Sequence, residues 1–166
     1  ISRPADNRQS RRLQLATPGP FTFILEATKE VPRRLSHPSR RTIGLRVPDH
    51  PVTSALLDLV GQPLIATTLI APGESEPMND PLQIRERFEK QVQAIVDAGA
   101  CPRQPTTVID LTGDTPVVVR LGRGDPVLLG LTAEPACRDR PTATKVISLR
   151  HRQSGRVGCE QKEQRT

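Results

Sequence analysis

Aromatic side chains are almost missing from this sequence. It contains no Tyr and no Trp, and its aromatic residues are Phe21, Phe23 and Phe88. Proteins that bind single-stranded nucleic acid usually stack the bases on several aromatic side chains, so this mode of binding is disfavoured. For the same reason, any core that the chain builds must be mainly aliphatic.

Cysteine, histidine and long apolar runs are scarce as well. The spacing of the Cys and His residues disfavours a structural zinc site or a disulfide framework, since no CxxC pair occurs. No apolar run approaches the roughly 18 residues of a membrane-spanning helix, and no signal-peptide pattern opens the chain. We therefore expect a cytoplasmic protein without a membrane partner. The scattered residues are Cys101, Cys137, Cys159, His37, His50 and His151.

The net charge of +6 is carried by the two ends of the chain. Residues 1–16 have a net charge of +3 and residues 132–166 a net charge of +4, which leaves −1 for residues 17–131. The basic excess therefore says little about the partner of the central segment. Because the first residue is Ile1 and the only methionine is Met78, we expect the sequence to be part of a longer protein.

Composition divides the chain into three parts. We interpret residues 1–16 as the basic remnant of an N-terminal region and residues 17–131 as the C-terminal portion of a folded domain. Residues 132–166 lack hydrophobic periodicity and are rich in Arg, Pro, Thr, Gln and Gly. This composition is typical of disordered segments, so we expect a disordered basic tail.

The segment 17–131 alternates between strand patterns and helix patterns, which predicts an α/β layered domain. Its β-branched and apolar runs predict strands that are bounded by Pro, Gly and Asp residues. The last two strands form a hairpin around Thr112, Gly113 and Asp114. The predicted strands are 21–27, 42–47, 64–70, 106–111 and 116–119.

Two helices are predicted between these strands. The first begins at Pro51 and ends before Gly61, a residue type that commonly follows a helix. The second begins at Pro81, with Asn79 or Asp80 as its N-terminal cap, and runs to Gly99. Its apolar face follows the helical repeat of 3.6 residues. That face consists of Ile84, Phe88, Val92, Ile95 and Val96.

Polar residues stand where several predicted strands begin or end. The predicted hairpin opens with Thr106 and closes on Arg120. Arg46 lies near the end of the predicted strand 42–47, and Thr68 near the end of the predicted strand 64–70. Ligands of open α/β sheets sit beyond the carboxyl ends of the strands, where hydroxyl and guanidinium groups suit a phosphate or carboxylate. Each residue also has a simpler interpretation, because threonine favours strands and a terminal arginine often makes a surface ion pair.

The segment 31–41 is strongly basic. Its arginines could contact the phosphates of a nucleic acid, or the segment could be an exposed connection between two strands. The sequence leaves both interpretations open. The arginines are Arg33, Arg34, Arg40 and Arg41.

Four motifs, taken in order, resemble those of the YrdC family. They are TPGPFTFIL, TIGLRVPDHP, PLIATTLIAPG and QPTTVIDLTGDTPVVVRLGRGD. They look most similar to the YciO-like branch of these L-threonylcarbamoyladenylate synthase homologues, over roughly residues 17–125. The resemblance implies a twisted mixed α/β sheet with flanking helices and a positively charged cavity on one face, here as an incomplete domain.

The resemblance also implies an activity. Enzymes of this family condense L-threonine, bicarbonate and ATP, with Mg²⁺, into threonylcarbamoyl-AMP and pyrophosphate for the threonylcarbamoyladenosine modification of tRNA. Such a nucleotidyltransferase must hold a triphosphate and align the attacking carbamate oxygen with the α-phosphorus. The residues that match nucleotide- or phosphate-binding positions of the family are Arg120, Thr106, Thr68, Ala66, Thr22 and Arg46.

Departures from the family pattern qualify this expectation. Ile65 and Ile70 replace a serine and an asparagine of the synthase strand, and the family's YPTDT-like strand and Lys-x-Arg clamp have no counterpart before Thr17. We therefore expect weak or absent synthase activity from the chain as written. The alternative is a YrdC-like module that binds double-stranded RNA or tRNA without synthase activity.

Overall fold

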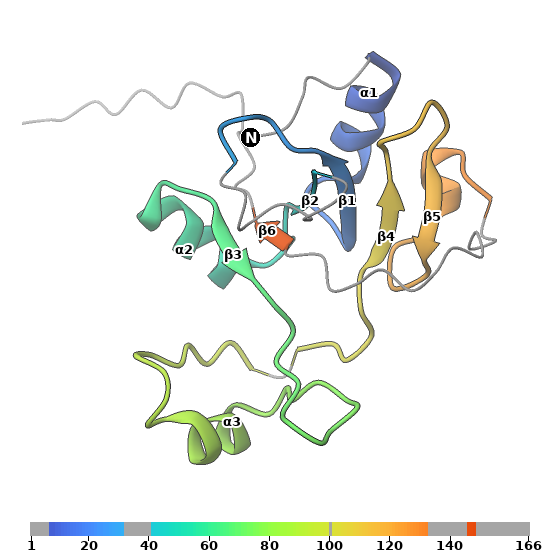
Figure 1. The fold of residues 1–166 in the computed structure, drawn as a ribbon. Helices are drawn as coiled ribbons and strands as arrows, with labels where there is room; N and C mark the ends of the chain where they lie inside the picture. Colours follow the sequence, from blue (N-terminus) through green and yellow to red (C-terminus); the bar gives the residue numbers. More distant parts are fainter. Residues whose placement is uncertain (1–6, 32–40, 100, 133–145, 149–166) are drawn as a thin grey trace, which may run out of the picture.

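A computed structural model describes residues 7–31, 41–99, 101–132 and 146–148 (Figure 1). Strands and helices alternate along most of the chain, as the sequence predicts. In chain order the elements are α1 Asn7–Ala16, β1 Phe21–Glu26, β2 Thr42–Arg46, α2 Pro51–Val60, β3 Leu64–Ala66, α3 Pro81–Phe88, β4 Thr107–Asp110, β5 Val117–Arg120, the 3-10 helix η1 Pro126–Leu129 and β6 Val146–Ser148.

The described strands form one mixed sheet in the order β3-β6-β2-β1-β4-β5. The central strand β1 pairs antiparallel with β2 and parallel with β4, and β4 pairs antiparallel with β5. On the other side, β6 lies parallel to β2 and antiparallel to β3. The prediction of a mixed α/β sheet with flanking helices is confirmed.

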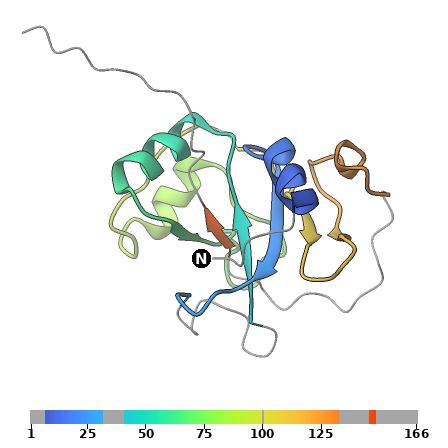
Figure 2. The same ribbon diagram turned by 90° about the horizontal axis from the view of Figure 1, so that it is seen from above.

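One face of the sheet carries the hydrophobic core. Phe23, Ile43 and Ile109 are 2%, 0% and 0% exposed and alternate along their strands with residues of the other face. Ala16 of α1 and Leu129 of η1 belong to the same cluster of buried residues. Figures 1 and 2 show α1 next to β1, so this helix and η1 cover the core face.

Helix α1 lies within residues 1–16, for which the sequence analysis predicted no element. Its C-terminal Ala16 is buried, and Leu13 packs against the core. The Gln9 side-chain amide donates to the carbonyl oxygen of Leu111 at 3.3 Å, which joins the helix to the end of β4. Sequence analysis missed this helix because its charged residues outnumber the few apolar ones that make contact.

Helix α2 has the predicted bounds. Pro51 occupies its first turn, and Gly61 follows it in the left-handed conformation at φ 67°, with its N–H bonded to the carbonyl of Leu57. Within this helix only Leu57 is buried, at 1% exposure, while Leu59 is 87% exposed.

Helix α3 is shorter than predicted. It begins as expected, with the Asp80 carboxylate accepting from the Leu82 N–H at 3.0 Å, but it ends at Phe88 and not at Gly99. None of its residues is buried, and Val96 of the expected apolar face is 63% exposed. A helix without tertiary packing gains little stability from propensity alone, which explains the early end. Figure 1 shows α3 below the sheet.

Two further predictions differ from the structure. The strand predicted at 64–70 ends at Ala66, and the residues after it run as an irregular segment to Ala71. The disordered tail predicted from residue 132 is wrong for Val146–Ser148, which forms β6 between β2 and β3. The predicted hairpin is confirmed: Asp110 accepts from the N–H and the hydroxyl of Thr112, at 2.9 and 2.7 Å, and thereby fixes its turn.

Candidate anion-binding site

A row of residues crosses the sheet on the face opposite the aromatic core. Thr22 pairs with Val108, and Val108 pairs with Arg120. Because Phe23 pairs with Leu45 in the antiparallel register, Thr22 lies level with Arg46. Residues paired across neighbouring strands point to the same face. Arg46, Thr22 and Arg120 therefore share one face. The sequence analysis expected the polar groups beyond the carboxyl ends of the strands, but Thr22 and Thr106 lie at the amino ends of the parallel strands β1 and β4, and only Arg46 and Arg120 end their strands.

The centre of the row is a pair of buried hydroxyl groups. The Oγ1 atoms of Thr22 and Thr106 lie 2.8 Å apart, and the two residues are 4% and 8% exposed. One hydroxyl donates to the other, and the pair still has lone pairs and one O–H for a further partner. Each buried hydroxyl has the other as its hydrogen-bond partner, and the pair can form a further hydrogen bond to a ligand.

Arg120 reaches back to this pair. Its guanidinium donates from Nη2 to the carbonyl oxygen of Thr106 at 3.0 Å. This bond uses one N–H of an otherwise exposed residue, so the remaining donors can turn to an anion. The predicted neighbourhood of Thr106 and Arg120 at the two ends of the hairpin is therefore present in the structure.

Arg46 is the most unusual cation of the row. It is half-buried, and its Nε is buried without a hydrogen-bond partner among the described residues. Burial, followed by the charge of Arg123, lowers the pKa of Arg46, and Cys101 opposes this shift. A buried donor without a partner is costly unless a ligand or water satisfies it. An anion at this position would satisfy it and would also neutralise the two guanidinium groups.

Thr68 and Ala66 do not join this cluster. Ala66 ends β3, three strands away from β1 in the sheet, and Thr68 follows it in an exposed loop. With neighbouring strands about 4.8 Å apart, the backbone of Ala66 lies about 14 Å from β1. The strand that was expected to carry Thr68 to the site ends before it. Their predicted roles at the nucleotide stay predictions.

The basic segment 31–41 is described only at its first and last residues, Val31 and Arg41. Arg33, Arg34 and Arg40 lie outside the described residues. Arg41 is exposed, has a positive φ of 50°, and its carbonyl oxygen accepts from the Ala27 N–H at 2.8 Å. A nucleic-acid contact by these arginines therefore stays a prediction.

Arg123 is not among the site residues predicted from the sequence. This residue stands between Gly122 and Gly124 in the loop that follows β5, and its backbone N–H donates to the carbonyl oxygen of Pro105 at 2.9 Å. The loop thereby returns to the start of β4, beside Thr106. The two glycines on either side of one arginine were the available signal, since such spacing marks a close backbone approach.

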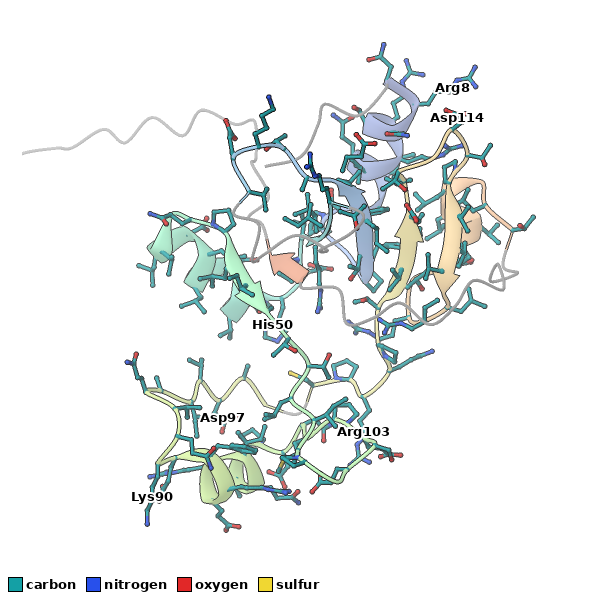
Figure 3. All side chains as sticks on the ribbon, viewed as in Figure 1. Arg8, His50, Lys90, Asp97, Arg103 and Asp114 are labelled. Carbon is teal, nitrogen blue, oxygen red and sulfur yellow. The ribbon has the colours of Figure 1, made fainter. Side chains whose placement is uncertain are left out.

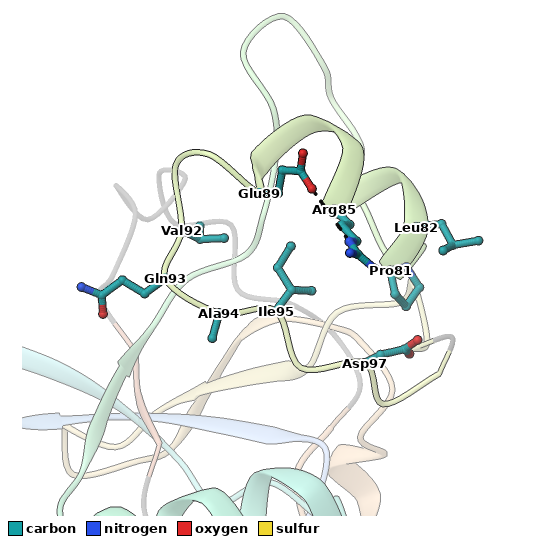
Figure 4. Close-up of a pocket in the computed structure, with 9 residues that line it drawn as sticks. All are labelled: Pro81, Leu82, Arg85, Glu89, Val92, Gln93, Ala94, Ile95 and Asp97. Atoms are coloured by element: carbon teal, nitrogen blue, oxygen red, sulfur yellow. Dashed lines mark ion pairs between the residues drawn. The ribbon is translucent and has the colours of Figure 1, made fainter.

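The structure also has a cavity outside this region. Figure 4 shows it between α3 and the segment that follows, and its volume is about 350 Å³. It is lined by Pro81, Leu82, Arg85, Glu89, Val92, Gln93, Ala94, Ile95 and Asp97. Its charged pair, Arg85 and Glu89, is exposed and 3.8 Å apart, and none of the predicted site residues lines it. The convergent polar groups of the sheet make the better candidate for a functional site.

The described residues contain neither a candidate metal cluster nor a membrane-spanning helix. In that part of the chain, no group of three or more His, Cys, Asp or Glu side chains is placed to hold a metal ion. There, too, each helix is too short or too polar to cross a membrane.

Comparison with known proteins places this geometry in a family. The Sua5/YciO/YrdC family model, described as "Telomere recombination", matches residues 1–122, which extends the predicted resemblance back to the first residue. The uncharacterized protein YciO of Escherichia coli K12 is 52% identical over 120 residues, which are 72% of this chain and 58% of that protein. The threonylcarbamoyl-AMP synthase of Pyrococcus abyssi is 31% identical over 63% of this chain and 31% of its own length.

Solved structures agree with this match. The crystal structure of E. coli YciO superposes with a TM-score of 0.71 and 49% identity, over 77% of this chain and 62% of that one. P. abyssi Sua5 complexed with L-threonine gives a TM-score of 0.66 and 26% identity, over 74% and 36% of the two chains. The sequence thus spans less than two thirds of the relatives that it matches. The family model matches more than half of this chain. The chain therefore belongs to the Sua5/YciO/YrdC family.

Proposed function

We propose that this chain carries the phosphate-binding wall of an enzyme that makes threonylcarbamoyl-AMP from L-threonine, bicarbonate and ATP, for the threonylcarbamoyladenosine modification of tRNA. One observation carries the proposal: Thr22, Arg120 and Arg46 of three strands, and Thr106 just before a fourth, gather on one sheet face. Relatives at about 30% identity are named threonylcarbamoyl-AMP synthases, and one of them was solved with L-threonine.

The proposed reaction builds up negative charge on phosphate oxygens, which hydrogen-bond donors and guanidinium groups can stabilise. The threonine amine and bicarbonate first give an N-carboxylate and water. A carboxylate oxygen then attacks the α-phosphorus, the bond from that phosphorus to the bridging oxygen breaks, and pyrophosphate leaves. Arg120 and the Thr106 hydroxyl would donate to phosphate oxygens and neutralise the charge that grows on them.

Magnesium would be bound mainly by phosphate oxygens of ATP and not by a protein cage. Bound in this way, the ion would withdraw charge from the phosphates and favour the departure of pyrophosphate. The protein's own contribution is then to orient the nucleotide.

The test measures ATP binding and pyrophosphate release by the full chain. We expect MgATP to bind, and Arg120→Gln to weaken that binding about 10-fold or more, as for the loss of a charge-assisted hydrogen bond. Arg85→Gln, which removes an equal charge from the exposed pair with Glu89, is the control and should leave binding unchanged. Equal loss in both variants, or no ATP binding at all, would remove the support for a nucleotide site.

Pyrophosphate release tests the reaction itself. If the site is complete in this chain, release should require both threonine and bicarbonate and should fall in Arg120→Gln. The weak activity expected from the sequence is a prediction for the same assay. Binding of double-stranded RNA or tRNA, and a cytoplasmic location, likewise stay predictions.

A further inference from the structure

Strand β5 has one residue more than its partner β4 over the stretch that carries Arg120. Ile109 pairs with Val118, but Val108 pairs with Arg120, so Val119 is an extra residue and forms a β-bulge. In a regular register, Val119 would pair with Val108, and Arg120 would point to the core face, because successive strand residues alternate between the two faces. The bulge therefore turns Arg120 from the core face to the face of the polar row.

Beyond the bulge, the chain is held by the hydroxyl of one buried residue, Thr107. This hydroxyl accepts from the Gly122 N–H at 2.9 Å and donates to the carbonyl oxygen of Gly124 at 2.5 Å. Thr107 is 0% exposed and shares the core face with Ile109, which lies two residues further along β4. The chain that follows Arg120 is therefore tied to the core side of the sheet.

The approach of this chain to β4 is unusually close. A Cβ at Gly122 would lie 2.3 Å from the Pro105 carbonyl oxygen, which also accepts from the Arg123 N–H at 2.9 Å. On the other face, the Arg120 guanidinium donates to the Thr106 carbonyl at 3.0 Å. Four hydrogen bonds thus join the end of β5 and the loop after it to the start of β4. They oppose a slip of β5 along β4.

We propose that Thr107 is a positioning residue of the candidate anion site. From the opposite face of the sheet, its hydroxyl holds the bulge at Val119 in place, and the bulge directs the Arg120 guanidinium to a phosphate at the Thr22 and Thr106 hydroxyls. This inference rests on the proposed function, because it names what keeps that site assembled. Thr107 acts through Arg120 and does not contact the ligand, since it is buried on the core face.

Loss of the Thr107 hydroxyl would act selectively on the site. Without its two bonds, β5 can return to the regular register, and a slip of one residue turns Arg120 away from the polar row. The pair of Val118 with Ile109 precedes the bulge and keeps its place in the core. Binding also becomes weaker when a long side chain must first be ordered by the ligand. Anion affinity should therefore fall even where the fold is kept.

The experiment titrates MgATP into the full chain by calorimetry and compares exchanges at two threonines of one hairpin. Thr107→Val removes the hydroxyl that holds the bulge, and Thr107→Ser restores it. The control is Thr112→Val, which removes the hydroxyl that donates to Asp110 at 2.7 Å in the turn. Figure 3 labels Asp114 in this turn, at the end of the hairpin away from the start of β4.

We expect Thr107→Val to weaken MgATP binding about 3-fold or more, and Thr107→Ser and Thr112→Val to match the wild type. The loss must also depend on Arg120. Thr107→Val should therefore add nothing to the loss caused by Arg120→Gln when the two are combined. Additive losses in the double variant would overturn the positioning role, because Thr107 would then act on the site by another route.

A second variant releases the bulge without removing a hydroxyl. Gly122→Ala pushes the loop away from the Pro105 carbonyl and should give the same Arg120-dependent loss of MgATP affinity. Gly113→Ala is its control, because the nearest atom would lie 3.8 Å from the new Cβ. Thermal melts show which variants are folded. Wild-type affinity in every folded variant of Thr107→Val and Gly122→Ala would overturn the inference.

Two further readouts separate this inference from the proposed function. Hydrogen exchange of the Gly122 amide should be slow in the wild type and in Thr107→Ser, and faster in Thr107→Val. Fast exchange with unchanged MgATP affinity would reject the positioning role and leave the proposed function intact.

Inorganic pyrophosphate is the second ligand. If it binds with the same dependence on Thr107 and Arg120 while MgATP does not bind, the positioning role is supported and the proposed function is rejected. A wild-type chain that binds neither ligand would overturn both.

Discussion

The hydroxyl oxygens of Thr22 and Thr106 meet at 2.8 Å although 84 residues separate them in the sequence. Both residues are buried, one on β1 and the other just before β4. Their contact joins two motifs that are distant in the chain at the centre of the polar row. Stability and binding at this face can therefore be tested through the same few residues.

The hydroxyl pair should show strong coupling in stability. Thr22→Val or Thr106→Val alone leaves a buried hydroxyl without its partner and should lower the free energy of unfolding by about 1–3 kcal/mol. The double variant replaces both hydroxyls by methyl groups and should lose much less than the sum of the two. Urea unfolding of the four proteins measures this coupling, and additive losses would show that the bond contributes little.

Thr107 should matter through its hydroxyl and not through its volume. Thr107→Val removes the donor to Gly124 and the acceptor of Gly122, and we expect a loss of about 1–3 kcal/mol in the free energy of unfolding. Thr107→Ser keeps both bonds and should lose clearly less. Similar losses in both variants would assign the effect to the methyl group.

A side chain at Gly124 should be poorly tolerated. Gly124→Ala places a methyl group against the ring of Phe21, which is only 4% exposed, and overpacking of this kind costs roughly 1–3 kcal/mol. Gly113 in the hairpin turn is the matched control, because its nearest atom would lie 3.8 Å from a new Cβ. Thermal denaturation should show a lower Tm for the first variant and little change for the second. An unchanged Tm for Gly124→Ala would mean that Phe21 can move away.

Replacement of Arg46 should stabilise the fold and weaken anion binding. The pKa of Arg46 is lowered, chiefly by burial, so its protonated form is less favourable in the folded chain than in the unfolded one. That cost is present below the folded pKa and disappears only as the pH rises through it. Arg46→Met should therefore raise the free energy of unfolding in urea, but only modestly, because solvent screens part of the charge of this half-buried side chain. A destabilised variant would show that Arg46 has a structural partner.

Sequence patterns correctly predicted the elements whose ends are set by residues close in the sequence. Pro51 and Gly61 bracket α2, Asp80 caps α3, and Asp110 with Thr112 forms the hairpin turn, and each of these depends on residues close in sequence. The predictions failed where the outcome depends on distant packing. Helix α3 was predicted too long because none of its residues is buried by the part of the chain that the structure describes, and α1 was missed because its stability comes from contacts with Leu111 and the core.

The same distinction between local and distant contacts applies to the residues of the candidate site. Thr106 and Arg120 lie at the two ends of one hairpin, so their proximity could be predicted. Thr68 was expected on a strand that ends two residues before it, and its motif gave no sign of that end. Arg123 was missed because its position depends on bonds of the following loop to Pro105 and Thr107, which no periodic pattern encodes.

The parallel pairing of β1 with β4 has a consequence for how the protein folds. Phe21 pairs with Thr107, so this central ladder closes a loop of more than eighty residues, whereas β1 with β2 and β4 with β5 are more local pairs. The entropy cost of closing a large loop must be met before the contacts that close it stabilise the fold. Such contacts therefore slow folding, and we expect them to form late in it. The Thr22–Thr106 contact lies in this late ladder, so the polar row is assembled near the end of folding. A ligand that bridges the row would then act mainly by slowing unfolding, and kinetic stability would report on its occupancy.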